Sequence, residues 1–304
     1  MAAIAPICRL TPEEPAMPKV AFLPHFISQQ AKILEDAGID SGKAEVEWIL
    51  CHLLDVDRLN LYLHGAELLD ERALARFDEI IVRRLERYPL QFILEEAWFY
   101  GRKFYVNPSV MAPAPETEVL CELALKFIED AHIERPRVLD IGTGSGVIAV
   151  TLAAERNDAA VVALDISPEA LEVARRNARD LGAAERIDFR LSNFYEKVAP
   201  GESFDLILSN PPYISEKEYP TLQQEVLHDP RIAMTAGEDG LDAIREIIRG
   251  APGFLAPEGR VMFEIGFSQA DAIEKIVGQD ARYLSFNCAR DLNRLDRIAI
   301  LRCR

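Results

Sequence analysis

From residue 113 to the end of the sequence, short apolar runs alternate with longer amphipathic stretches. Each run has the length of one strand, and strands that are buried on both faces show continuous rather than alternating apolar character. Strands that are joined through helices form a mostly parallel, doubly wound sheet. The predicted strands are 137–142, 161–166, 187–191, 204–209, 260–266 and 297–303, and the predicted helices are 115–131, 145–156, 168–182, 241–255 and 268–278. We therefore predict an α/β domain over residues 113–304.

The sequence before this domain has a helical pattern. Apolar residues recur at the spacing of one helix face. The two stripes are Val46, Ile49, Leu50 and Leu53, and Leu74, Phe77, Ile81 and Leu85. Asp40 and Ser41 precede the first stripe and Asp70 precedes the second, at positions typical of helix N-caps. Residues 22–89 are therefore predicted to form a small helical bundle.

A connector, residues 90–112, is predicted between the bundle and the α/β domain. Aromatic residues flank Gly101 and Arg102, which favours a two-stranded hairpin with glycine in the turn. Residues 1–21 contain several prolines and no basic region followed by an apolar stretch. We interpret them as a disordered lead rather than a signal peptide.

Composition argues against several classes of protein. No apolar run approaches the roughly 18 residues of a membrane-spanning helix. The five cysteines are scattered without a C-x-x-C motif, which is typical of reduced thiols in a cytoplasmic protein and offers no zinc site. The five histidines are equally dispersed, so a metal enzyme is not expected.

The net charge of −16 opposes tight, charge-driven binding to DNA or RNA. One basic cluster runs against this trend. It consists of Arg83, Arg84, Arg87, Arg102 and Lys103. We interpret the cluster as a solvated helix face and turn rather than a nucleic-acid site.

A glycine-rich segment, DIGTGSG, follows the predicted strand that ends near Asp140 and precedes a helix. Glycines at this position allow a tight turn and a close approach of the backbone to a ligand at the helix N-terminus. The next strand ends in Asp165, where an acidic side chain can bind both hydroxyls of a ribose. Loop and acid together predict a ligand of the adenosine type.

The spacing G-T-G-S-G differs from the dinucleotide fingerprint and resembles the S-adenosylmethionine loop of class I methyltransferases. In that family the acid before the loop helps to place the methionine end of the cofactor, which gives Asp140 this role by resemblance. An alternative is that the Asp140 carboxylate only hydrogen-bonds the glycine loop, and the two roles are compatible.

The segment SNPPYIS, residues 209–215, follows the predicted strand FDLILS. Proline cannot donate to a strand ladder and biases the preceding residue towards extended backbone. Asn210 and Pro211 are thus held rigidly beyond the carboxyl end of a strand, where α/β folds bind ligands. The Asn210 side-chain carbonyl and the Pro211 backbone carbonyl can accept the two N–H protons of a planar amide or amine, which orients its nitrogen. Pro212 stiffens the segment, and Tyr213 offers a flat face to a planar acceptor.

The N-P-P-Y motif resembles that of methyltransferases acting on adenine, guanine or glutamine nitrogens. Three further segments resemble the HemK/PrmC family, which methylates the glutamine of the Gly-Gly-Gln motif in peptide chain release factors. They are PAPETEVL (113–120), TAGEDGLDAIREII (235–248) and FEIGFSQ (263–269). The resemblance extends over residues 22–304. It implies a class I, Rossmann-like methyltransferase domain with a mostly parallel seven-stranded sheet, preceded by a helical bundle that recognises the release factor.

The resemblance also implies roles for individual residues. Cofactor contacts are implied for Asp140, Gly142, Thr143, Gly144, Ser145, Gly146, Asp165, Phe194 and Asn210. Catalysis is implied for Asn210, Pro211 and Tyr213, and substrate binding for Asn210, Pro211, Pro212 and Tyr213. Glu116 and Thr117 are expected either at the mouth of the site or at a helix N-terminus, and Glu264 is expected to be a structural carboxylate at the sheet end.

The sequence departs from the family pattern at two positions near the site. Ala114 replaces the usual arginine, and Asn193 replaces an acid that precedes the aromatic Phe194. These departures leave open a cofactor-binding scaffold without activity. The N-P-P-Y motif leaves open two other substrates, a ribosomal protein as the glutamine substrate and adenine or guanine in a nucleic acid.

Overall fold

The computed structural model describes residues 23–304, and the predicted disordered lead lies outside these residues. The chain divides into two compact units, whose described parts are residues 23–86 and 87–304. No helix in the described part of the chain has both the length and the apolar character needed to cross a membrane.

Over residues 23–86, the N-terminal unit is a bundle of four helices: α1 (Leu23–Asp36), α2 (Gly42–Leu54), α3 (Arg58–Leu68) and α4 (Glu71–Leu85). The two predicted stripes contribute Val46, Ile49, Leu50, Phe77 and Ile81 to its core. Asp70 caps α4 by accepting a hydrogen bond from the backbone N–H of Ala73 at 2.7 Å, as predicted. Ser41 lies at the N-cap of α2 without a capping hydrogen bond, because its hydroxyl donates to the side chain of Glu45.

The second unit begins with a short helix, α5 (Leu90–Leu94), and a hairpin of β1 (Glu96–Phe99) and β2 (Arg102–Tyr105). The predicted turn at Gly101 has φ +70°, in the region that favours glycine. Asn177 ties the hairpin to the glycine loop: it exchanges two hydrogen bonds with the Tyr105 backbone and donates a third to the carbonyl of Ser145. The hairpin is therefore part of the framework that holds this loop.

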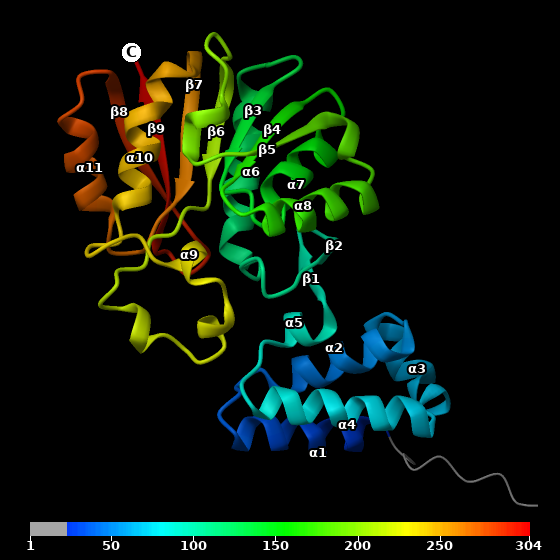
Figure 1. Cartoon of the computed structure of the whole chain (residues 1–304). Helices are drawn as coiled ribbons and strands as arrows, with labels where there is room; N and C mark the ends of the chain where they lie inside the picture. Colours follow the sequence, from blue (N-terminus) through cyan, green and yellow to red (C-terminus); the bar gives the residue numbers. More distant parts are fainter. Residues whose placement is uncertain (1–22) are drawn as a thin grey trace, which may run out of the picture. The chain divides into compact units, whose positions relative to one another are not determined.

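Seven strands form one sheet in the order β5-β4-β3-β6-β7-β9-β8 (Figure 1). They are β3 (Arg137–Ile141), β4 (Ala160–Asp165), β5 (Ile187–Leu191), β6 (Phe204–Ser209), β7 (Leu255–Glu264), β8 (Tyr283–Arg290) and β9 (Asp296–Cys303). Only β9 runs antiparallel to its two neighbours. The predicted fold class, a mostly parallel seven-stranded sheet after a helical bundle and a hairpin, is confirmed.

Two details differ from the sequence prediction. The apolar pattern did not reveal β8, because the segment YLSFNCAR mixes buried and exposed positions at an edge of the sheet. The helix predicted over 241–255 ends at Gly250, a 3-10 turn follows, and β7 starts at Leu255. Pro252, which cannot continue a helix ladder, lies in that turn.

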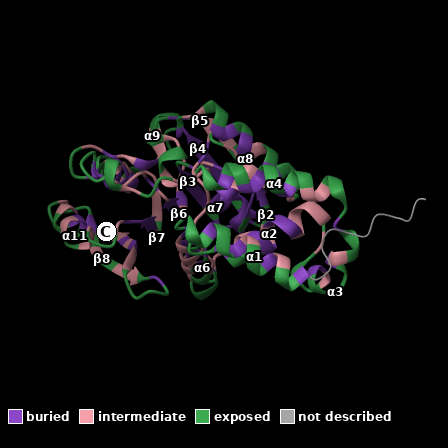
Figure 2. Cartoon of the chain, turned by 90° about the horizontal axis from the view of Figure 1, so that it is seen from below, coloured by how far each residue is buried: buried purple, intermediate pink, exposed green. Residues whose placement is uncertain are grey.

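Helices cover both faces of the sheet. They are α6 (Pro115–Asp130), α7 (Val147–Glu155), α8 (Pro168–Asp180), α10 (Asp242–Gly250) and α11 (Ala270–Gly278). Val138 packs in the core with α6 and α7, whereas Leu139 and Ile141 pack in the core with α10 and α11, so successive residues of β3 alternate between faces. Figure 2 shows the central strands β3, β4 and β6 as largely buried, which matches the apolar runs from which they were predicted.

Candidate active site

The chain crosses over at β3, since β4 and β5 lie on one side of this strand and β6 and β7 on the other. Such a switch point opens a crevice at the carboxyl ends of the strands. Ile141 pairs with Ser209 there, and the Ser209 hydroxyl donates to the Ile141 carbonyl at 2.7 Å. The glycine loop and the N-P-P-Y segment thus start from adjoining strand ends. A cavity of about 870 Å³ lies between them.

Backbone hydrogen bonds hold the glycine loop against the end of β4. Gly142 and Thr143 both donate to the carbonyl of Leu164, at 2.8 and 2.9 Å. Gly144 donates to Oδ2 of Asp165 at 2.8 Å. Gly142, Thr143, Gly144 and Ser145 line the cavity, and Gly146 lies behind them as the N-cap of α7. Most of the residues predicted at the loop therefore lie together at the cavity wall.

Asp165 lines the cavity and is 9% exposed. Its Oδ1 accepts from the backbone N–H of Ser167 at 2.9 Å, so this carboxylate holds both the glycine loop and the start of α8. Burial raises the pKa of Asp165, and the backbone donors, among them Ser167 and Gly144, oppose this shift.

Asp140 is fully buried before the loop. Its Oδ2 accepts from the Thr143 hydroxyl at 2.7 Å, so the predicted bond to the glycine loop is present. Its Oδ1 has no hydrogen-bond partner among the described residues. Burial raises the pKa of Asp140 to about 7, against the opposing effect of the Thr143 hydroxyl. Asp140 does not line the cavity, and a backbone contact with Ala149 of α7 also opposes the rise of its pKa. In this structure its carboxylate braces the glycine loop from behind the cavity wall.

Phe194 and Asn193 lie on the cavity wall beyond β5. Phe194 begins the 3-10 turn η2 (Phe194–Lys197) with φ +45°, a left-handed conformation that is uncommon for an aromatic residue. The Ser192 hydroxyl donates to the carbonyl of Phe194 at 2.8 Å and holds this turn. Asn193 is exposed and donates to Glu196, so it brings an uncharged polar group to this part of the wall.

The N-P-P-Y segment follows β6. Asn210, Pro211 and Pro212 line the cavity, whereas Tyr213 packs against the core with α10 and α11. Asn210 donates through Nδ2 to the hydroxyl of Thr117 at 3.0 Å. Its Oδ1 accepts no hydrogen bond from residues 23–304 in the structure.

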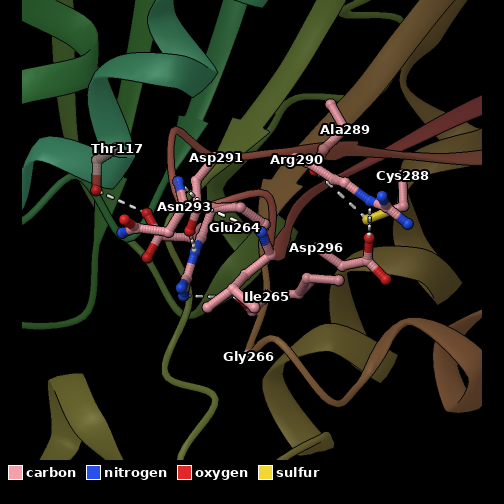
Figure 3. A network of polar contacts seen from close by, with 12 residues as sticks. Thr117, Glu264, Ile265, Gly266, Cys288, Ala289, Arg290, Asp291, Asn293 and Asp296 are labelled. Atoms are coloured by element: carbon pink, nitrogen blue, oxygen red, sulfur yellow. Dashed lines mark hydrogen bonds and ion pairs between the residues drawn. The ribbon is translucent and has the colours of Figure 1, made fainter.

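Glu264, predicted to be a structural carboxylate, is the centre of this half of the site (Figure 3). It lies at the end of β7 and is 2% exposed. It accepts from the Thr117 hydroxyl at 2.7 Å, as Figure 3 shows, and from the Tyr213 hydroxyl at 3.0 Å. Arg297, which pairs with Asp291 at 3.2 Å, contributes positive charge nearby.

Gln269, the last residue of the FEIGFSQ segment, holds three backbone positions together. Its Nε2 donates to the carbonyls of Tyr213 and Gly240, and its Oε1 accepts from Gly266. A Cβ on Gly240 would lie 2.3 Å from the Tyr213 carbonyl, so only glycine fits there. This side chain joins the N-P-P-Y segment to the segment TAGEDGLDAIREII, which contains Gly240.

Comparison with known proteins identifies the family of the chain. Residues 26–94 match the PrmC N-terminal domain, and residues 117–238 match the methyltransferase small domain. The release factor glutamine methyltransferase of Cereibacter sphaeroides is 43% identical over 270 residues, which is 88% of this chain and 94% of that protein. The chain belongs to the release factor glutamine methyltransferase family. The predicted resemblance to HemK/PrmC is thereby confirmed.

Further relatives extend the agreement. The release factor glutamine methyltransferase of Nitratidesulfovibrio vulgaris is 39% identical over 95% of this chain and 97% of its own length. Among solved structures, the hMettl16 catalytic domain in complex with the MAT2A 3′UTR hairpin 6 has a TM-score of 0.55 at 14% identity, covering 76% of this chain and 81% of that one. The latter similarity supports the methyltransferase fold alone.

Proposed function

We propose that this enzyme transfers a methyl group from S-adenosylmethionine to the side-chain amide nitrogen (N5) of the glutamine in the Gly-Gly-Gln motif of peptide chain release factors, in the cytoplasm. The observation that carries the proposal is the Asn210 amide at the cavity wall. Its Nδ2 is bonded to Thr117 and its Oδ1 is left to accept an N–H from an acceptor. The family membership adds the substrate class.

The residues present fit S-adenosylmethionine. The volume of about 870 Å³ is within the range of small-molecule and cofactor sites. Asp165 lines the cavity and suits a ribose, whereas the Asp140 carboxylate lies behind the lining and acts on the cationic methionine end through its negative charge and the loop that it holds. Phe194 offers an apolar wall for an adenine ring. The bound cofactor would supply an electrophilic methyl group.

The acceptor half of the site orients a weak nucleophile. An amide nitrogen has a delocalised lone pair, so hydrogen bonds that fix both of its protons direct the nitrogen and favour reaction. We assign one acceptor to Oδ1 of Asn210 and the other to the backbone carbonyl of Pro211. Pro211 is buried and Pro212 follows it, so this corner has little freedom to reorient.

A protein substrate needs contacts beyond one amide, because a single side chain gives too little binding surface for selectivity. We assign the recognition of the release factor to the N-terminal bundle. On α3, Leu59 and Leu63 are 69% and 62% exposed and lie one turn apart, so this helix presents apolar surface to a partner. The predicted basic cluster does not favour a nucleic acid, because Arg84, Arg102 and Lys103 pair with carboxylates.

The test is a parallel methylation assay. The protein is incubated with labelled S-adenosylmethionine and, separately, a release factor, a ribosomal protein, tRNA and DNA, and the label is mapped by mass spectrometry. We expect label on the Gly-Gly-Gln glutamine, and none on a release factor in which that glutamine is replaced by alanine. Label on a ribosomal protein or nucleic acid alone, or cofactor binding without any transfer, would overturn the proposal.

A further inference from the structure

The hydroxyl of Thr117 lies between two polar groups that no other contact joins directly. It is 3.0 Å from Nδ2 of Asn210 and 2.7 Å from Oε2 of Glu264. The three residues come from α6, from the segment after β6 and from the end of β7. Thr117 is 1% exposed and Glu264 is 2% exposed, so water does not compete for these bonds.

The number of protons fixes the direction of both bonds. An ionised carboxylate only accepts, so the single hydroxyl proton of Thr117 points to Glu264. The Thr117 oxygen is then an acceptor towards Asn210, and the asparagine must present its NH2 group rather than its oxygen. Because the two ends of a side-chain amide have nearly the same shape, it is this network that selects the orientation.

We propose that Glu264 and Thr117 are positioning residues. They hold the Asn210 amide with its Oδ1 towards the substrate amide that receives the methyl group. This inference rests on the proposed glutamine methylation. Without the Glu264 carboxylate, the amide can turn over and present two N–H groups to the N–H groups of a substrate amide. Donors then face donors, and the substrate nitrogen loses the contact that orients it.

The groups around Glu264 determine its protonation state, and with it the direction of the hydrogen bonds from Glu264 to Asn210. Burial raises its pKa, Glu116 of α6 adds to that effect, and the hydroxyls of Thr117 and Tyr213 and the charge of Arg297 from β9 oppose it. Arg297 donates to the Asp291 carboxylate at 3.2 Å and to the carbonyl of Ile265 at 3.3 Å. When Glu264 is protonated, it can donate to Thr117, whose proton then points to Asn210 and favours the reversed amide.

This reversal gives the proposal a measurable signature. At saturating cofactor and release factor, kcat of the native enzyme falls as the pH is lowered through the titration of Glu264. Glu264→Gln has no such group, so the fall disappears. Its amide can donate or accept towards Thr117, so both orientations of Asn210 are populated and kcat at neutral pH is reduced.

The threonine supplies the matched variants. Thr117→Val keeps the shape and removes the hydroxyl, and we expect kcat to fall by about tenfold to a hundredfold with the Kd of S-adenosylmethionine changed less than about threefold. Thr117→Ser keeps the hydroxyl and restores kcat to within about threefold of the native value. Thr151→Val is the control, because Thr151 is also fully buried and its hydroxyl has no partner in the described structure.

The readouts are kcat, KM and their pH profiles on a release factor, with cofactor affinity by calorimetry and folding by thermal denaturation. A fully active Thr117→Val, or an acid-side fall in kcat that persists in Glu264→Gln, overturns the inference while leaving glutamine methylation in place. Failure of the native enzyme to methylate any release factor overturns the proposed function instead. If Thr117→Val does not fold, the pH profiles of kcat for the native enzyme and Glu264→Gln are compared instead. The inference then requires an acid-side fall in the native enzyme that is absent from Glu264→Gln.

Discussion

The two halves of the active site are built in different ways. On the cofactor side, Gly144 bonds to Asp165, only 21 positions further along the chain, and the loop is held mainly through backbone N–H groups. On the acceptor side, Thr117 bonds to Asn210 and to Glu264 across 93 and 147 positions, and the contacts join side chains. One half is a local conformation, and the other is a tertiary assembly.

This difference predicts different sensitivities. A site built on backbone conformation depends on the φ angles of its glycines, and its loss shows in binding. A site built on side-chain atoms depends on the identity and protonation of single groups, and its loss shows in turnover. Substitutions on the two sides should therefore separate a loss of binding from a loss of turnover.

The largest effect is expected for Asn210→Ala on the acceptor side. The variant removes the oxygen assigned to the substrate amide, so kcat should fall by about a hundredfold to a thousandfold. Cofactor affinity should change far less, because the glycine loop keeps its own hydrogen bonds. Methyl transfer to a release factor and calorimetry with S-adenosylmethionine measure the two quantities.

Asn287→Ala is the control for this variant, since Asn287 is exposed on β8 at the sheet edge. It should retain native kcat. Turnover of Asn210→Ala close to that of this control would remove the role assigned to Asn210.

On the cofactor side, Asp165→Ala should act mainly on binding. It removes the assigned ribose contact and also the acceptor for the N–H groups of Gly144 and Ser167. We expect the Kd of S-adenosylmethionine to rise by about tenfold to a hundredfold, since buried donors are left without partners. An unchanged Kd, measured by calorimetry, would show that the ribose is bound elsewhere.

The pH dependence of cofactor binding tests Asp140. Its pKa of about 7 in the folded protein, against an ordinary value of 3.8, means that the folded chain holds this proton more tightly than the unfolded chain. The contribution of Asp140 to stability is thus present below pH 3.8 and is lost as the pH rises to about 7. A cationic cofactor group favours the ionised carboxylate, so binding should weaken by up to about tenfold per pH unit below 7. Calorimetry at pH 6, 7 and 8 measures this slope.

Asp140→Asn, which cannot ionise, should bind with an affinity that is nearly independent of pH over this interval. If the native protein and this variant share one pH profile, another group is responsible and Asp140 does not sense the cofactor charge.

The same contrast explains what the sequence could predict. The glycine loop and Asp165 follow one another along the chain, so their spacing alone was enough to predict a ligand site. The strands β3, β4 and β6 were predicted because burial on both faces leaves a continuous apolar run. The strand β8 was missed because it lies at the edge of the sheet, where only part of its surface is buried.

Glu264 shows what remained out of reach. Its position near the end of a predicted strand suggested a structural carboxylate, but a linear sequence does not show which side chains face it. The contacts with Thr117 and Tyr213 exist only after α6, β6 and β7 have been brought together. A charged residue that ends an apolar strand was the available signal, because burial of a charge requires partners.

The smallest effects are expected for alanine substitutions in the glycine loop. They distinguish the cost of the backbone conformation from the loss of cofactor contact. Gly144 (φ +55°) and Gly146 (φ +84°) both lie in the left-handed region, so alanine at either costs about 1–2 kcal/mol of folding free energy. A Cβ on Gly144 meets no atom within 4 Å and lies at the cavity wall, whereas one on Gly146 lies 3.1 Å from Cβ of Ala174. Gly146→Ala should therefore lose about 1 kcal/mol more stability through crowding against α8. Gly144→Ala should lose more cofactor affinity, because its methyl group occupies space at the ligand surface.

Denaturant unfolding measures the stability of both variants, and calorimetry measures their affinity for the cofactor. Equal losses of stability and affinity in the two variants would contradict this assignment. They would mean that Gly146 has no specific role in packing and Gly144 no specific role in cofactor binding.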